Sequence, residues 1–288
     1  MYFADLHCDT LYKMLKKGVN YNDDSLSVRY SDFSQFDKQI RNYAIYLENR
    51  KDDPKYLYTQ MLNSYNEIKS RVDPDLVVPL LSVEGGALAE SGYSVENIKN
   101  DGVVIMSLAW NYDNSLAGGS GGFSGITNRG REIISQMNGC GIALDLSHLN
   151  KRSFYDAIEL TDVPIATHSC LETVMPHQRN ISIEQARLIK EKQGVLGICF
   201  YPEFLGGNVF EAVYKNVYLL LEAGLEKVIA IGSDFDGADM SPELFSILDV
   251  PKLYEYLLLK IGDKDILDGI FYKNAEVFVD KLLTNTKK

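Results

Sequence analysis

The stretch Tyr2-Phe3-Ala4-Asp5-Leu6-His7-Cys8-Asp9 opens the chain with a short apolar run that ends in a His-x-Asp pair. It is the first of eight such runs, whose starts lie 22 to 40 residues apart. That spacing leaves room for one helix and two loops after each strand, which is typical of a parallel β/α sheet. The predicted strands are Tyr2–Leu6, Asn42–Leu47, Leu76–Val83, Val103–Ala109, Gly141–Leu146, Val163–Thr167, Gly194–Tyr201 and Lys227–Ser233.

These runs are apolar throughout rather than alternating, as expected for strands that are covered on both faces. Eight strands that alternate with helices predict a closed (β/α)8 barrel, the TIM barrel. An open doubly wound sheet is the alternative, because it has the same alternation of strands and helices.

Helix signals fall between the predicted strands. Ser182-Ile183-Glu184-Gln185 is a capping box that opens a helix, and Gly194 can close that helix. Residues 18–41 are the least regular part of the chain, and Tyr254–Leu283 indicates extra helices after the last strand. No linker divides the sequence, so we expect one domain over residues 1–288.

Composition excludes several classes of partner. The 288 residues carry a formal net charge of −11, whereas nucleic-acid binding needs clustered Lys and Arg. An acidic surface does not attract anionic lipid, and no apolar run reaches the ~18 residues of a membrane span. We therefore expect neither nucleic acid nor membrane as a partner.

The four cysteines form no C-x-x-C pair, and each lies in or beside an apolar run. This pattern favours reduced thiols buried in the core. The N-terminus enters a strand directly and lacks the basic and apolar regions of a signal peptide. Both features predict a cytoplasmic protein.

Polar side chains fall at the ends of five predicted strands. Three of the four histidines are among them, namely His7, His148 and His168, together with Glu84 after the third run and Asp234 after the eighth. Each alone has an ordinary structural explanation. In a parallel barrel, however, the carboxyl ends of the strands meet at one mouth, where active sites lie. Five such residues therefore predict a common site.

The spacing indicates metal binding. Residues i and i+2 of a strand point to the same side, so His7 and Asp9 can hold one cation. His148 and His168 can hold a second, and the two oxygens of Glu84 can bridge the pair. Imidazole with carboxylate suits Zn²⁺ better than Ca²⁺ or Mg²⁺. Two such ions would generate hydroxide at neutral pH and polarise a carbonyl group.

At this point the sequence resembles the membrane (renal) dipeptidases, zinc peptidases with a (β/α)8 fold of the metallo-dependent hydrolase type. Its motifs occur in the family's order: Asp5-Leu6-His7-Cys8-Asp9-Thr10, Val83-Glu84-Gly85-Gly86, Asp145-Leu146-Ser147-His148, His168-Ser169, Arg179-Asn180, Phe200-Tyr201 and Ser233-Asp234-Phe235-Asp236-Gly237. The resemblance implies that His7, Asp9, Glu84, His148 and His168 ligate two Zn²⁺ ions. It gives Glu84 the bridging position, and therefore a place among the catalytic residues.

The resemblance implies three further roles. Arg179 matches the arginine that holds the terminal carboxylate of the substrate, a task that suits a planar two-pronged donor. Asp234 matches the carboxylate that carries a proton from the attacking water to the leaving amine. Tyr201 matches an aromatic residue at the substrate pocket, although a core tyrosine of strand seven is the simpler alternative.

The sequence departs from the family in the fourth-strand motif. Trp110 stands where animal members carry a histidine that contacts the substrate carbonyl, and Asn111 can donate a hydrogen bond instead. We therefore place Trp110 and Asn111 among the substrate-binding residues. The remaining histidine, His177, lies in the loop before Arg179. Gly118-Gly119-Ser120-Gly121-Gly122 lacks a phosphate-loop lysine and is interpreted as a flexible loop over the site.

The prediction is a binuclear zinc dipeptidase that hydrolyses dipeptides with a metal-bound hydroxide. The resemblance extends the expected substrates to those with a C-terminal D-residue, and implies a homodimer. Two alternatives stay open. One is another binuclear barrel hydrolase, acting on a cyclic amide, a lactam, a nucleobase as in deaminases, or a phosphoester. The other is a metal-binding protein without catalytic activity.

Overall fold

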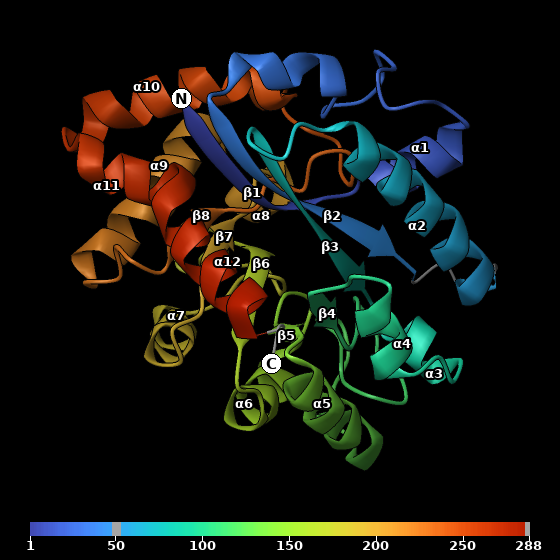
Figure 1. Ribbon diagram of the computed structural model, residues 1–288. Coiled ribbons are helices and arrows are strands. Elements are labelled where there is room, and N and C mark those ends of the chain that lie inside the picture. Colours follow the sequence, from blue (N-terminus) through green and yellow to red (C-terminus); the bar gives the residue numbers. More distant parts are fainter. Residues whose placement is uncertain (48–52, 286–288) are drawn as a thin grey trace.

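Eight parallel strands form the centre of the computed structural model, which describes residues 1–47 and 53–285 (Figure 1). Each strand pairs with the next strand in the sequence, so the order in the sheet is β1 to β8. The strands are β1 Tyr2–Cys8, β2 Lys38–Tyr46, β3 Val77–Glu84, β4 Ile105–Ser107, β5 Ala143–Asp145, β6 Pro164–Ser169, β7 Leu196–Ile198 and β8 Ile229–Ile231.

The sheet nearly closes into a barrel because the segment after β8 bonds to the end of β1. The backbone N–H of Asp234 donates to the carbonyl of His7 at 3.0 Å, and the N–H of Asp9 donates to the carbonyl of Phe235 at 2.9 Å. The predicted (β/α)8 barrel is therefore confirmed over the open sheet. The contacts that close it involve residues of the predicted site.

All eight predicted strands are present, but β2 begins at Lys38, four residues before the expected start at Asn42. The first part of β2 contains polar residues, so it lacks the apolar pattern from which the other strands are predicted. Arg41 is fully buried, with its Nη1 3.1 Å from Asp5 Oδ2 and its guanidinium over the ring of Phe33. A buried ion pair that also packs on an aromatic ring replaces the apolar pattern there.

Helices surround the strands (Figure 1). The α-helices are α1 Thr10–Lys17, α2 Pro54–Arg71, α3 Ala87–Glu90, α4 Val95–Asn100, α5 Asn128–Cys140, α6 Lys151–Leu160, α7 Ile183–Glu191, α8 Pro202–Leu205, α9 Val209–Glu222, α10 Val250–Ile261, α11 Lys264–Asp268 and α12 Asn274–Asn285. Three short 3₁₀ helices are η1 Tyr30–Gln35, η2 Pro242–Leu244 and η3 Ile247–Asp249, and a π-helical turn is η4 Gly269–Lys273.

The capping box at Ser182 is confirmed, since its side chain accepts from the N–H of Gln185 and the Gln185 side chain accepts in return. The helix ends at Glu191, before the expected stop. Gln193 takes the left-handed conformation (φ 59°), whereas Gly194 lies where a Cβ would come within 2.3 Å of the Pro164 carbonyl. Gly194 therefore serves close packing on β6.

The helical segment formed by η4 and α12 covers the end of the barrel opposite the site. The ring of Tyr272 lies 5.2 Å from that of Tyr2, at the start of β1, and Asn274 donates to the carbonyl of Ile229, at the start of β8. One apolar cluster joins strand residues with this segment: Ala4, Leu6, Ile40, Leu80, Ile105, Ala143, Ile165, Ala230, Tyr272, Ala275, Phe278, Val279 and Leu282.

All four cysteines are free thiols, as predicted, and Cys140 alone is only partly buried. None of the helices within residues 1–47 and 53–285 has the length and apolarity that a membrane span requires.

Gly232, next to β8, allows the strands to approach closely below the mouth. A Cβ there would lie 1.7 Å from the carbonyl oxygen of Thr167 in β6. We predict that Gly232→Ala lowers the free energy of unfolding by at least about 2 kcal/mol, because backbone must move to admit the methyl group. Urea denaturation measures the loss.

Gly139 of α5 is the matched control, because a Cβ there has no atom within 4 Å and the position is helical. Gly139→Ala should leave stability unchanged or raise it by up to about 1 kcal/mol. Equal effects of the two substitutions would contradict the close approach at Gly232.

Candidate metal centre

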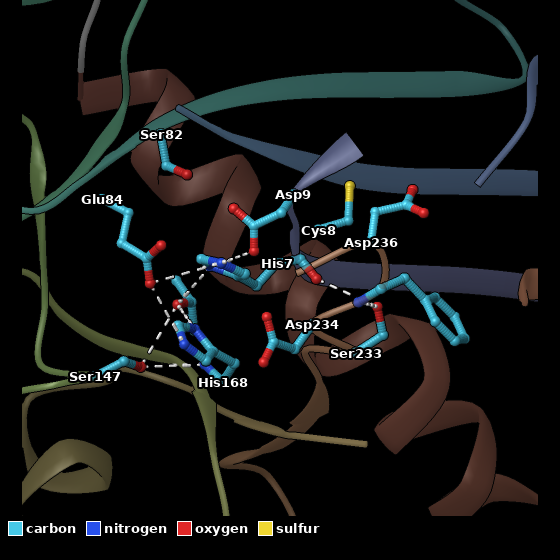
Figure 2. Close-up of polar contacts among 12 residues, drawn as sticks. His7, Cys8, Asp9, Ser82, Glu84, Ser147, His168, Ser233, Asp234 and Asp236 are labelled. Carbon is cyan, nitrogen blue, oxygen red and sulfur yellow. Dashed lines mark hydrogen bonds and ion pairs between the residues drawn. The ribbon is translucent and has the colours of Figure 1, made fainter. Parts of the chain in front are cut away.

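The predicted ligands converge at the mouth of the barrel (Figure 2). His7 lies near the end of β1, Glu84 is the last residue of β3 and His168 lies in β6, while His148 follows β5. Asp9 comes directly after β1 and precedes α1. All five residues are buried, with 6% or less of each exposed.

One carboxylate oxygen joins the three histidines. Glu84 Oε1 lies 2.8 Å from Nε2 of His148, 3.6 Å from Nε2 of His168 and 3.8 Å from Nε2 of His7. Figure 2 shows the Glu84 carboxylate directed at the His7 and His168 rings. A single oxygen among three imidazole nitrogens has the position expected of a shared ligand.

His7 and Asp9 are close for a different reason than predicted. His7 Nε2 lies 3.4 Å from Asp9 Oδ2. The strand ends at Cys8, however, so strand alternation does not place Asp9. Asp9 begins the turn into α1, and its N–H bonds to the carbonyl of Phe235 across the closing seam of the barrel.

Asp234 completes a second group of ligand atoms. One ligand atom each of His7, Asp9 and Asp234 lies within 4.8 Å of the others, as do those of His7, Glu84 and His168. His7 is therefore common to two groups that are each able to hold a cation. Figure 2 shows Asp234 directed toward this centre from the segment after β8.

Three non-glycine residues at the mouth have left-handed backbone conformations: His148 (φ 69°), Asp234 (φ 64°) and Asp236 (φ 70°). Such conformations disfavour side chains with a Cβ, and they concentrate at functional sites. Gly237 follows, where a Cβ would come within 2.2 Å of Asp9 Oδ2. The turn after β8 thus brings its backbone against the carboxylates.

The Nε2 atoms of His148 and His168 lie 2.9 Å apart. His148 Nδ1 lies 2.9 Å from Asn111 Oδ1, which also accepts from Ser120 Oγ, so Nδ1 of His148 is the protonated nitrogen. His148 Nε2 then carries a lone pair directed at a carboxylate and at another imidazole. A cation between these atoms removes the repulsion.

The ionisation of the histidines is consistent with metal binding. Burial, with the positive charge of Arg179 nearby, lowers the pKa values of His148 and His168 well below the usual value, so both are neutral. Burial also lowers the pKa of His7, but the carboxylates of Glu84, Asp9 and Asp234 together outweigh it and raise that pKa to about 10. The carboxylates that hold a proton on His7 would equally hold a metal cation.

The carboxyl groups are perturbed in the opposite direction. Burial, followed by the nearby Asp9, raises the pKa of Asp234 to about 7. Burial also raises the pKa of Glu84 well above its usual value, although His7 opposes this. Excess negative charge is therefore buried at the mouth.

Two buried ligand atoms, His7 Nε2 and Asp9 Oδ1, have no hydrogen-bond partner in the part of the chain that the structure describes. Buried polar atoms are normally paired, and those that are not have a functional explanation. Imidazole nitrogens with carboxylate oxygens form the ligand set of zinc-type ions. The residues present thus fit the predicted metals.

A cavity of about 700 Å³ opens over the centre. The predicted substrate-binding residues Arg179, Tyr201, Trp110 and Asn111 all line it, as does Asp234. Tyr201 follows β7 and is not a core residue of that strand.

Arg179 is buried in the wall of the cavity, with 4% of its surface exposed. Its Nη2 donates to the carbonyl of His168 at 3.2 Å, and its guanidinium lies 5.2 Å from the ring centroid of Phe204. Its Nε has no hydrogen-bond partner within residues 1–47 and 53–285. A fixed guanidinium with an unused donor is a suitable site for an anionic group.

The loop after β4 differs from the prediction. Asn111 Oδ1 accepts a hydrogen bond from Nδ1 of His148, so this side chain orients a predicted ligand. None of residues 118–122 lines the cavity; Gly118–Ser120 are buried, whereas Gly121 is exposed. A Cβ at Gly119 would come within 2.2 Å of the Trp110 carbonyl, so this stretch supports the Trp110 loop from behind.

Residues that the sequence did not assign also line the cavity. His177 is one of them; its Nδ1 accepts from the N–H of Arg179 and its ring packs on Phe204. Lys13 is another, paired with Asp236 at 3.0 Å. Only the scarcity of histidine in this chain could have drawn attention to His177.

The sequence profile of the membrane dipeptidases, peptidase family M19, matches residues 32–280. The chain belongs to this family. The predicted resemblance is thereby confirmed, as is the prediction of a metallodipeptidase at the level of the family. Family membership also implies dependence on metal.

Individual relatives agree with the family. An uncharacterized protein of Klebsiella pneumoniae, from the pqqA 5′ region, is 28% identical over 71% of this chain and 82% of its own length. An uncharacterized dipeptidase of Schizosaccharomyces pombe is 29% identical over 65% of this chain, but the match spans only 48% of the yeast protein.

A metallopeptidase from Rhodobacter sphaeroides has the same fold, with a TM-score of 0.86 over 97% of this chain and 99% of that one, at 20% identity. That protein was crystallised with a phosphinate mimic of the dipeptide L-Ala-D-Ala.

Glu84 should lower the stability of the metal-free protein, because its raised pKa means that the folded state disfavours the charged form. At neutral pH, above the pKa of a glutamate in the unfolded chain, this cost is present. We predict that Glu84→Gln unfolds at a higher denaturant concentration than the metal-free wild type, with a free energy of unfolding about 1 kcal/mol larger.

The same substitution should remove the stabilisation that Zn²⁺ gives the wild type. That stabilisation is about 2.7 kcal/mol at one hundred times the dissociation constant. Denaturation with chelator and with added Zn²⁺ measures both effects. A variant that is less stable without metal, yet fully stabilised by Zn²⁺, would contradict this account of Glu84.

Proposed function

We propose that this protein is a binuclear zinc dipeptidase. The observation that supports this best is the position of Glu84 Oε1, within 3.8 Å of Nε2 of His7, His148 and His168, at the base of a cavity that also contains Arg179. A shared carboxylate oxygen suits a pair of ions, and a buried guanidinium suits a substrate with a free carboxylate.

In this proposal His7 and Asp9 would hold one ion and His148 and His168 the other, with Glu84 as a ligand available to both. When bound, a pair of divalent ions supplies an activated water and polarises the substrate carbonyl.

The strand order gives the substrate a direction. Arg179 and Tyr201 follow β6 and β7, whereas Trp110 and Asn111 follow β4, so the two pairs line different parts of the cavity. With the scissile carbonyl over the ligands, the C-terminal residue lies toward Arg179 and the N-terminal residue toward Trp110. Because Arg179 holds the terminal carboxylate at a fixed distance, dipeptides fit and longer peptides do not.

Asp234 is the proton carrier in this scheme. Its carboxylate adjoins the His7 and Asp9 ligand atoms and lines the cavity. An Asp234 oxygen takes a proton from the attacking water and gives it to the nitrogen of the leaving amine, so no net proton remains on the enzyme.

We extend the proposal to dipeptides with a C-terminal D-residue. The support is the Rhodobacter sphaeroides relative, whose bound ligand mimics L-Ala-D-Ala. The test of the proposal therefore uses both L-Ala-L-Ala and L-Ala-D-Ala.

The proposed binding of the substrate carboxylate by Arg179 can be tested by changing the arginine and the carboxylate separately and together. We predict that Arg179→Met lowers kcat/KM for these dipeptides by about a hundredfold or more, because a charge-assisted pair in a buried site is lost. The wild type should lose a similar factor on the corresponding dipeptide amides, which lack the carboxylate. Steady-state hydrolysis assays measure all four combinations.

The Arg179→Met variant assayed on the amides should have a kcat/KM little lower than that caused by either change alone, because both changes remove the same contact. Fully multiplicative losses would mean that Arg179 does not bind the carboxylate. A zinc-loaded wild type that cleaves neither dipeptide would contradict the proposed function itself.

A further inference from the structure

The hydroxyl of Thr167, in β6, lies directly behind two of the predicted metal ligands. Thr167 Oγ1 is 2.9 Å from Nδ1 of His168 and 3.3 Å from Nδ1 of His7. It is also 2.6 Å from Oδ2 of Asp145, at the end of β5. The threonine is fully buried and Asp145 nearly so.

The hydrogen-bond directions at this hydroxyl follow from its neighbours. A carboxylate oxygen can only accept, so the single hydroxyl proton of Thr167 points to Asp145 Oδ2, its nearest partner. The two lone pairs remain, and each can accept one N–H. The hydroxyl therefore accepts from Nδ1 of both His168 and His7. Ser147 Oγ, at 3.5 Å, is at the limit of hydrogen-bonding distance.

Asp145 is itself held in one orientation. Its Oδ1 accepts from the backbone N–H of Ser147 and from that of Thr167, both at 3.0 Å. This leaves Oδ2 for the Thr167 hydroxyl. The direction of the chain of bonds, from backbone through Asp145 and Thr167 to the imidazoles, is thereby determined.

We propose that Thr167, oriented by Asp145, is a positioning residue that keeps the proton of both His7 and His168 on Nδ1. Nε2 of neutral His168 then has a lone pair directed at the centre, and Nε2 of His7 is the nitrogen that would give up its proton to a bound ion. Asn111 does the same for His148. One hydroxyl thus determines which ring nitrogen carries the proton in two predicted ligands, one from β1 and one from β6. Groups behind metal ligands typically contribute 10- to 100-fold to metal affinity.

This inference rests on the proposed metal centre, and its test is the affinity for Zn²⁺ rather than activity. Thr167→Val removes the hydroxyl at nearly constant shape, whereas Thr167→Ser keeps it. Thr161→Val is the matched control, because Thr161 is equally buried but bonds the N–H of Val163, far from the ligands.

Asp145→Asn tests the direction of the bonds without removing the hydroxyl. The two backbone N–H groups keep the amide oxygen on their side, so the amide NH₂ faces Thr167 and donates to it. The Thr167 proton must then turn toward a histidine Nδ1, which forces the proton of that imidazole onto Nε2, where a metal should bind.

Competition with a chromophoric chelator measures the Zn²⁺ affinity, and urea denaturation of the metal-free proteins verifies folding. We expect Thr167→Val and Asp145→Asn to lose about 10- to 100-fold in affinity, with Thr167→Ser within about threefold of wild type and Thr161→Val unchanged. If Thr167→Val does not fold, the comparison of Zn²⁺ affinity between Asp145→Asn and Thr167→Ser tests the inference instead.

Wild-type affinity in Thr167→Val or in a folded Asp145→Asn would overturn the inference, as would equal losses in Thr167→Val and Thr167→Ser. These results differ from failure of the proposed function, in which the wild type itself would bind no Zn²⁺.

Discussion

Glu84 Oε1 lies among three imidazole nitrogens in a place that solvent barely reaches, with the carboxyl groups of Asp9 and Asp234 close by. Burying this much acidic charge is costly unless cations compensate it. His7, held in its charged form by these neighbours, and the nearby Arg179 guanidinium offset only part of the charge. In the proposed function, divalent ions bound at this centre would compensate the remaining negative charge.

The fold meets this constraint with backbone geometry. The seam that closes the barrel is made by hydrogen bonds of His7, Asp9 and Asp234, so closing the sheet also positions the ligands. His148 and Asp234, whose side chains reach the centre, both have left-handed backbone conformations. At Gly237 only a glycine fits beside the carboxylates. The segment formed by η4 and α12, at the opposite end of the barrel, contributes no residue to the site.

The strands, and the grouping of the predicted ligands at one mouth, were predictable because both follow simple rules. Buried parallel strands are apolar, and their carboxyl ends meet at one mouth, so His7, Glu84 and His168 could be placed together without a structure. The start of β2 was not predictable, since Arg41 is buried by an ion pair rather than by an apolar pattern. Thr167 was overlooked because a threonine within a strand is ordinary. Its importance comes from three distances that only the folded chain provides.

The loops account for the remaining differences. The resemblance identified Arg179, but the positions of His177 and of the glycine-rich stretch depend on how loops pack, which no periodicity reports. The central claim, a two-metal centre bridged by Glu84, is tested most directly by the number of Zn²⁺ ions bound per chain. Equilibrium dialysis at saturating Zn²⁺, with metal measured by atomic spectrometry, should give about two ions per chain. One ion or none would contradict the account.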